Sequence, residues 1–237
     1  MKKLTLLLLV AVVCSAGIFA FTRRGGSPPL PVVAPAAPAA ALDLAAVQTQ
    51  AATGSAPAQA RLAQALAKGE AGKRDFAAAA EWFRKAAEQG NADGQVGLAE
   101  LLEAGQGVKK DLSRAVELYR QAATNGHAGA QYNLAFMNES GRIGQVDHRA
   151  AAHWYQLAAE GGETLAQYDL AQRYERGVGV KADLVEAAKW FRLAAAHGQL
   201  EARARLAGVE SKLTSAERLE AARRANEFTP RPAAPAH

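Results

Sequence analysis

Cysteine, histidine and aromatic residues are scarce in this chain of 237 residues, and their scarcity excludes several classes of protein. Cys14 is the only cysteine, so no disulfide can form within one chain. None of the five histidines stands in an HExxH pattern or has a cysteine nearby that could complete a zinc site. The sequence also lacks a G-x-S-x-G elbow and a glycine-rich phosphate loop. We therefore expect no enzyme activity, no metal and no cofactor.

A basic surface is missing as well, although the formal net charge is +5. Residues 56–200 hold 17 basic and 17 acidic side chains, and the excess positive charge lies in the two terminal segments. A domain that binds nucleic acid presents a clustered basic face. The charge distribution therefore argues against nucleic acid as a partner.

One long hydrophobic run stands out, at residues 4–21, between Lys2-Lys3 and Arg23-Arg24. A basic start followed by an apolar stretch is typical of a bacterial export signal. The run is about as long as the shortest segments that span a bilayer. Two interpretations stay open for residues 1–24, a cleaved export signal and a retained N-terminal membrane anchor that would attach the protein to the membrane.

Lipidation at Cys14 is a third alternative, although Val13 stands where a lipobox normally has a small residue. With cleavage or retention we expect the chain in the periplasm, free or anchored in the inner membrane and facing the periplasm. A lipoprotein and a secreted protein are the remaining alternatives.

Proline is concentrated outside the centre of the chain. Five of the nine prolines fall within residues 25–41, where they prevent a helix or a central strand. The sequence therefore predicts a Pro/Ala-rich linker at 25–55, with a short amphipathic stretch at 42–50 that could pack on the first repeat. The proline-containing tail at 229–237 is predicted to be disordered.

The centre of the chain repeats with a period of 36 residues. An Ala-Ala pair recurs with an aromatic residue three positions ahead of it and a glycine shortly after it. The pairs stand at 86–87, 122–123, 158–159 and 194–195. Self-similarity at such a period is the signature of a solenoid, in which one small unit stacks on copies of itself.

Each unit predicts two helices joined by a turn. In the unit at 92–126, leucines at helical spacing fill the first half, and Gly105 and Gly107 then interrupt the helix. Asp111 is a suitable N-cap for the second helix, and it recurs as Asp75, Asp147 and Asp183. Neither helix can bury its apolar side alone, so the units must stack.

The strings GQGVKKDLSRAVELYRQAATNGHAGAQYNLA and GVGVKADLVEAAKWFRLAAAHG resemble Sel1-like repeats, which belong to the tetratricopeptide-like solenoids. The resemblance covers four repeats at 56–200, followed by capping helices at 201–228. Departures include Leu118 in place of tryptophan and Ile143 in place of a loop glycine. The resemblance implies an all-α fold, a right-handed α-solenoid of helix-turn-helix units with a C-terminal capping helix.

The resemblance also implies a scaffold or adaptor for protein–protein interaction, here in the bacterial cell envelope, with a protein or peptide as partner. A regulatory or assembly subunit of an envelope enzyme, or of a polysaccharide or secretion machine, is the alternative. Glycan binding is less favoured, because Trp82, Trp154 and Trp190 recur at a core position of the second helix.

In related two-helix repeats the first helix lines the concave side, which locates a candidate groove. The positions projected onto it are Asp93, Val96, Glu100, Glu103, Tyr132, Asn133, Phe136, Glu139, Tyr168, Asp169, Gln172 and Glu175. We hypothesise that this groove accepts a basic or mixed extended peptide, with Tyr132 and Phe136 as anchors and the carboxylates steering the encounter. The alternative is that the tyrosines are core between repeats and the acids form a solvated face.

Overall fold

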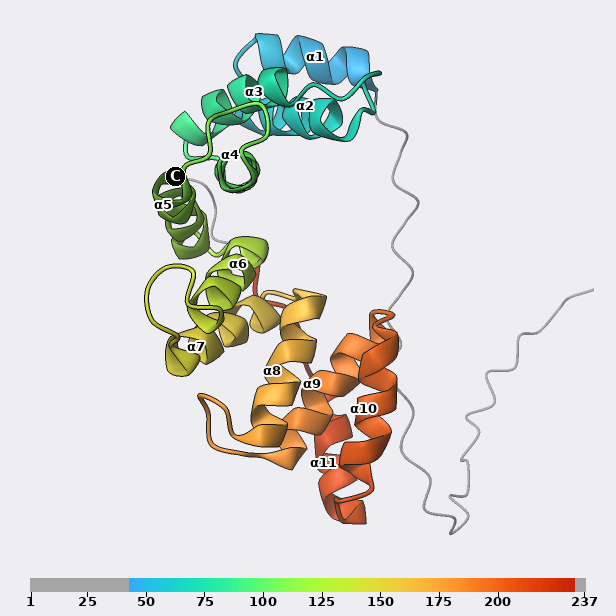
Figure 1. Cartoon of the computed structure of the whole chain (residues 1–237). Coiled ribbons are helices and arrows are strands. Elements are labelled where there is room, and N and C mark those ends of the chain that lie inside the picture. The colour runs from blue at the N-terminus through green and yellow to red at the C-terminus, as the bar shows by residue number, and fades with distance from the viewer. Residues whose placement is uncertain (1–42, 233–237) are drawn as a thin grey trace, which may run out of the picture.

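A computed structural model describes residues 43–232, which form eleven helices joined by short turns (Figure 1). Their bounds are α1 Leu44–Ala52, α2 Ala56–Lys68, α3 Phe76–Glu88, α4 Ala92–Ala104, α5 Leu112–Thr124, α6 Ala128–Glu139, α7 His148–Glu160, α8 Thr164–Arg176, α9 Leu184–Ala196, α10 Leu200–Glu210 and α11 Ser215–Asn226. The predicted all-α solenoid is confirmed, because the helices pack in sequence as helix-turn-helix units.

Helices follow one another along an arc, with α4 and α6 toward its inner side and α5 and α7 toward its outer side (Figure 1). The four predicted aspartate N-caps all form. Each carboxylate accepts the amide hydrogen of the residue three positions on, at 2.9–3.0 Å. These caps satisfy backbone donors that a helix start leaves unpaired, and they fix where every second helix begins.

The core consists of the repeating residues of the second helices. The first alanine of each Ala-Ala pair is fully buried, and the aromatic residue ahead of it is at most 3% exposed. These aromatic residues are Phe83, Tyr119, Tyr155 and Phe191. Because alanine adds little bulk, the helices approach closely and the large rings fill the space between successive units.

Two loop glycines explain the turn between the paired helices. Gly107 and Gly179 have φ of +69° and +75°, and a Cβ at either would lie within 2.3 Å of the backbone of Phe76 or His148. Ile143 occupies the matching place in the third unit, where the next residue, Gly144, adopts a positive φ instead. The substitution therefore reshapes one loop and leaves the stacking intact.

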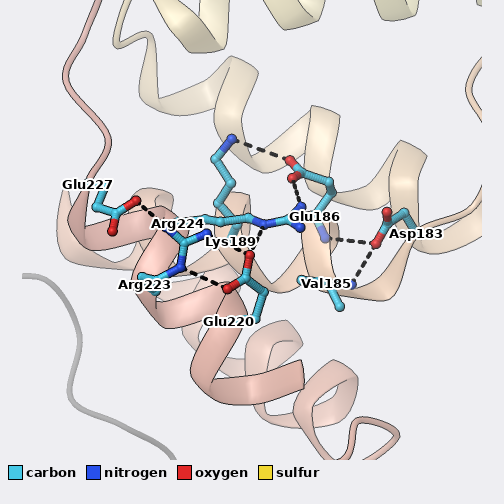
Figure 2. A network of polar contacts seen from close by, with 8 residues as sticks. All are labelled: Asp183, Val185, Glu186, Lys189, Glu220, Arg223, Arg224 and Glu227. Atoms are coloured by element: carbon cyan, nitrogen blue, oxygen red, sulfur yellow. Dashed lines mark hydrogen bonds and ion pairs between the residues drawn. The ribbon is translucent and has the colours of Figure 1, made fainter. Parts of the chain in front are cut away.

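The C-terminal end of the stack is closed by α10 and α11, which both pack on α9. On the surface, Glu186 of α9 pairs with Arg224 of α11 at 2.5 Å and with Lys189 at 3.3 Å (Figure 2). Inside, the buried Arg192 pairs with the buried Glu210 of α10. The predicted cap is therefore tied to the last repeat by charge as well as by apolar packing.

The segments on either side of the repeats also contain ordered parts. Helix α1 covers most of the amphipathic stretch at 42–50 and packs on the first repeat as expected, with Val47 and Ala51 against Ala58 and Leu62 of α2. The tail predicted to be disordered begins with residues that lie against α7, because the Arg231 amide donates to the Glu160 carbonyl at 2.7 Å. Local sequence does not determine the second contact, since Arg231 reaches Glu160 only when the tail folds back onto α7.

The export signal, the anchor, the lipidation at Cys14 and most of the linker fall at residues 1–42, outside the described residues. Within residues 43–232, no helix is both long and apolar enough to cross a membrane.

Candidate functional site

The predicted groove residues lie on three successive first helices, α4, α6 and α8, and we call the surface they form the first-helix face. Figure 1 shows α4 and α6 on the inner side of the arc, as the hypothesis requires. Among the described residues, no group of three or more His, Cys, Asp or Glu side chains lies close enough to hold a metal ion.

Three glutamates at equivalent positions near the ends of these helices are engaged within the chain. Glu103 pairs with Arg142, Glu139 with Arg173 at 2.5 Å, and Glu175 with Arg205 at 2.8 Å. Each arginine comes from a later element, so every pair joins neighbouring units. These carboxylates hold the solenoid together, and their negative charge is largely compensated.

Tyrosine hydroxyls complete two of these clusters. Tyr119 donates to Glu103 at 3.1 Å, and Tyr155 donates to Glu139 at 2.9 Å. The Arg173 guanidinium also lies over the Tyr155 ring, 4.6 Å from its centroid. Burial and the nearby carboxylates raise the pKa of both tyrosines, so the hydroxyls keep their protons and remain donors.

The proposed tyrosine anchors belong mainly to the contact between repeats. Tyr132 meets Tyr155, and Tyr168 meets Phe191, in the same edge-on geometry with ring centroids 5.6 Å apart. Both Tyr132 and Tyr168 are half-buried. This arrangement matches the alternative in which these rings are inter-repeat core.

Asp169 is the most perturbed carboxyl on the face. Burial raises its pKa to about 6, and the Glu139 carboxylate acts in the same direction. The Tyr132 hydroxyl donates to Asp169 at 3.3 Å, and the Gln172 amide donates to it at 3.4 Å. Burial and Asp169 together raise the pKa of Tyr132 to about 12.

A small cavity of about 80 Å³ opens beside Asp169. Its lining is polar and combines both signs of charge. The residues around it are Glu139, Asp169, Gln172, Arg173, Arg176 and Val178. This volume suits one or two water molecules or the end of one polar side chain.

The remaining predicted residues differ in how accessible they are. Asp93 accepts a hydrogen bond from His127, which lowers the pKa of Asp93. Val96 packs on the core, and Asn133 is half-buried. Glu100 stays accessible, and partial desolvation followed by the Glu103 charge raises its pKa. Phe136 is 47% exposed. Phe136, Glu100 and Asp93 are thus the predicted residues that stay exposed, and of these Asp93 is engaged by His127.

Sequence reasoning missed the residues that neutralise the face. Arg142, Arg173 and Arg205 stand at different positions within their repeats, so no periodic signal marks them. It also missed the role of His127, whose Nδ1 accepts the Ala130 amide hydrogen and so caps α6 at its N-terminus.

The repeated tryptophans are less uniformly buried than expected. Trp190 is buried as predicted, whereas Trp82 and Trp154 are half-buried. Lys85 lies over the Trp82 ring and Lys189 over the Trp190 ring, at 4.2 and 4.1 Å from the centroids. The prediction was therefore correct for Trp190, against which Phe228 packs, and overstated the burial of Trp82 and Trp154, the second of which lines a cleft.

The stacked helix pairs, the interlocked alanine and aromatic core and the capped end define a helical-repeat scaffold. The Sel1 repeat pattern matches residues 56–91, 92–127, 128–163 and 164–199, and the chain belongs to the Sel1 repeat family. The matched segments coincide with the helix pairs from α2 to α9.

Two solved structures support the same fold. A protective antigen of uropathogenic Escherichia coli with an SLR fold is 31% identical, with 78% of this chain and 48% of that chain covered and a TM-score of 0.53. A Sel1 repeat protein from Oxalobacter formigenes is 30% identical, with 70% and 48% covered and a TM-score of 0.65. The chain thus spans about half the length of each. Among curated proteins none matches.

Proposed function

We propose that this Sel1 repeat scaffold binds an extended segment of a protein partner on its first-helix face, and that it does so in the bacterial cell envelope. The observation that carries the proposal is Phe136, a large apolar side chain left 47% exposed on α6 among polar neighbours. Leu165 of α8 is similarly exposed, at 45%. Aromatic side chains of this kind anchor protein interfaces when a partner covers them.

The internal ion pairs narrow the kind of partner segment that fits the first-helix face. Because Glu103, Glu139 and Glu175 are compensated by arginines, the face is not the uniformly acidic groove of the sequence hypothesis. Glu100 remains as an exposed acceptor on α4, one repeat period before Phe136 of α6. A segment with an apolar residue and a donor group, such as an amide or a lysine, fits this combination better than a strongly basic one.

Envelope location rests on the basic start and apolar run at residues 1–24, and it supports a partner in the same compartment. N-terminal sequencing of the mature protein separates a cleaved signal from a retained anchor.

The proposal is tested by affinity purification from crosslinked envelope fractions. The Phe136→Asp and Glu100→Lys variants are compared with Leu219→Asp, which alters an exposed leucine of similar accessibility on the capping helix α11. We expect the first two to lose the main partner and the control to retain it. Equal recovery with all three would reject the first-helix face as the binding surface.

A further inference from the structure

The second helices line a repeated cleft that is distinct from the first-helix face. Between α3 and α5 it has a volume of about 310 Å³, and between α5 and α7 about 410 Å³. Four lining positions of the first cleft recur 36 residues later in the second. These pairs are Ala87 and Ala123, Glu88 and Thr124, Leu118 and Trp154, and Gln121 and Leu157.

The chain's own C-terminal segment runs along this row of clefts. Phe228 meets Trp190 edge-on with ring centroids 5.4 Å apart, on α9. The path then returns toward the middle of the solenoid (Figure 1), where Pro230 lies against Gly162. Arg231 and Pro232 reach the cleft between α5 and α7.

Glu160, the last residue of α7, makes two contacts with this segment. Its carbonyl accepts the Arg231 amide hydrogen at 2.7 Å, and its carboxylate pairs with the Arg231 guanidinium at 2.8 Å. The segment is therefore bound by an aromatic contact, a proline contact, a main-chain hydrogen bond and an ion pair. This is a peptide-recognition arrangement, with an extended proline-containing chain seated on helices.

The cleft between α3 and α5 repeats the key positions of this arrangement. Glu88 stands 72 residues before Glu160, and Leu118 stands 72 residues before Trp190. None of the described residues of the C-terminal segment lines this cleft. Leu118 stands where the other three repeats carry tryptophan, and with Leu98 and Leu102 it gives this cleft an apolar lining.

We propose that the cleft between α3 and α5 binds a partner segment that resembles the chain's own Phe228–Pro232, an extended stretch with an aromatic residue followed three positions later by arginine. The aromatic side chain packs against Leu102, with the buried Leu98 and Leu118 beneath it, and the arginine pairs with Glu88. The resident C-terminal segment serves as the internal template for this ligand.

Charges at the rim of the cleft refine the ligand further. Arg84 and Arg114 line it, and each also pairs with a glutamate of its own helix, Glu81 at 2.6 Å and Glu117 at 2.7 Å. The equivalent positions on α7 and α9 are Gln156 and Glu186. An acidic residue just ahead of the aromatic one suits this more basic rim, and Glu227 holds that place in the chain's own segment.

The test uses the full chain and a peptide of sequence EFTPRP in which benzoylphenylalanine replaces phenylalanine. After irradiation, peptide mapping should locate a saturable adduct on residues 84–121, and unlabelled EFTPRP should compete for it. An adduct found only on α9 would mean that the peptide merely displaces the resident segment, and it would overturn the proposal. So would the absence of a saturable adduct.

Two variants distinguish specific binding in this cleft from nonspecific labelling. Leu102→Asn removes apolar surface from the lining of the cleft and should lower the adduct yield at least about tenfold. Glu88→Arg should reduce crosslinking of EFTPRP and allow crosslinking of the charge-reversed peptide EFTPEP, which the wild type should label poorly. The control variant Glu201→Arg on α10 should change neither. Undiminished labelling of Leu102→Asn, or no crosslinking of EFTPEP to Glu88→Arg, would contradict the proposed site.

Discussion

The hydroxyl of Tyr155 donates a 2.9 Å hydrogen bond to Glu139, the residue that also receives Arg173. The same bond joins Tyr119 to Glu103 one repeat earlier, whereas the next repeat has Phe191 and no hydroxyl. A residue expected to steer a partner is therefore a junction between two units. The stability of the stack and the chemistry of its inner face are built from the same side chains.

Replacing Tyr155 with phenylalanine reproduces the arrangement of the last repeat. We expect a loss of about 1–2 kcal/mol in the free energy of unfolding, because a hydrogen bond to a charged acceptor is removed and the ring stays. Urea denaturation followed by circular dichroism measures it. An unchanged midpoint would mean that the hydroxyl contributes nothing to the junction.

Gly179 is predicted to tolerate no side chain. Its φ is +75°, and a Cβ would lie 2.0 Å from the carbonyl oxygen of His148. Gly179→Ala should therefore destabilise the protein by about 1–3 kcal/mol or more. Gly208→Ala is the matched control, since Gly208 lies in α10 facing open space, and there we expect a small gain in thermal stability.

Asp169 makes stability depend on pH in an unusual direction. Its pKa is about 6 in the folded protein and 3.8 as an ordinary aspartate, so between these values the folded state binds more protons than the unfolded state. Its contribution should therefore favour folding increasingly as pH falls from 7 toward 4. The difference in unfolding free energy between the wild type and Asp169→Asn isolates this term, and a flat difference over that range would contradict the assigned pKa.

Arg192 and Glu210 form the most deeply buried ion pair that joins the last repeat to its cap. Arg192→Met should cost about 3–5 kcal/mol, because it leaves a carboxylate buried without its partner. The double variant Arg192→Met/Glu210→Met should recover much of that loss. A double-mutant cycle measures the coupling, and additive losses would show that the two residues act independently.

Much of the fold could be predicted because the repeat constrains it. A 36-residue period, aspartates at helix starts and alanines at helix crossings depend on local sequence, and each unit supplies an independent copy of the signal. Cross-unit contacts carry no such signal. Arg173 and Arg205 reach their glutamates through the stacking geometry, and Arg231 reaches Glu160 only after the tail folds back.

The predicted groove residues lie on the first helices, where the sequence placed them, but the sequence showed only part of the chemistry of that face. Sequence shows that Glu139 is acidic and that Tyr132 is aromatic. It does not show that Arg173 compensates the charge of Glu139, or that the Tyr155 ring packs against the Tyr132 ring. Those facts depend on which residue of the next unit lies opposite, and this is set by packing.

Photo-crosslinking in living cells tests the central claim most directly. A photoreactive residue in place of Phe136 should give one discrete adduct that disappears when Glu100 is changed to lysine, while the same residue in place of Leu219 should not give it. Failure to form any specific adduct from position 136, or the same adduct from both positions, would contradict binding on the first-helix face.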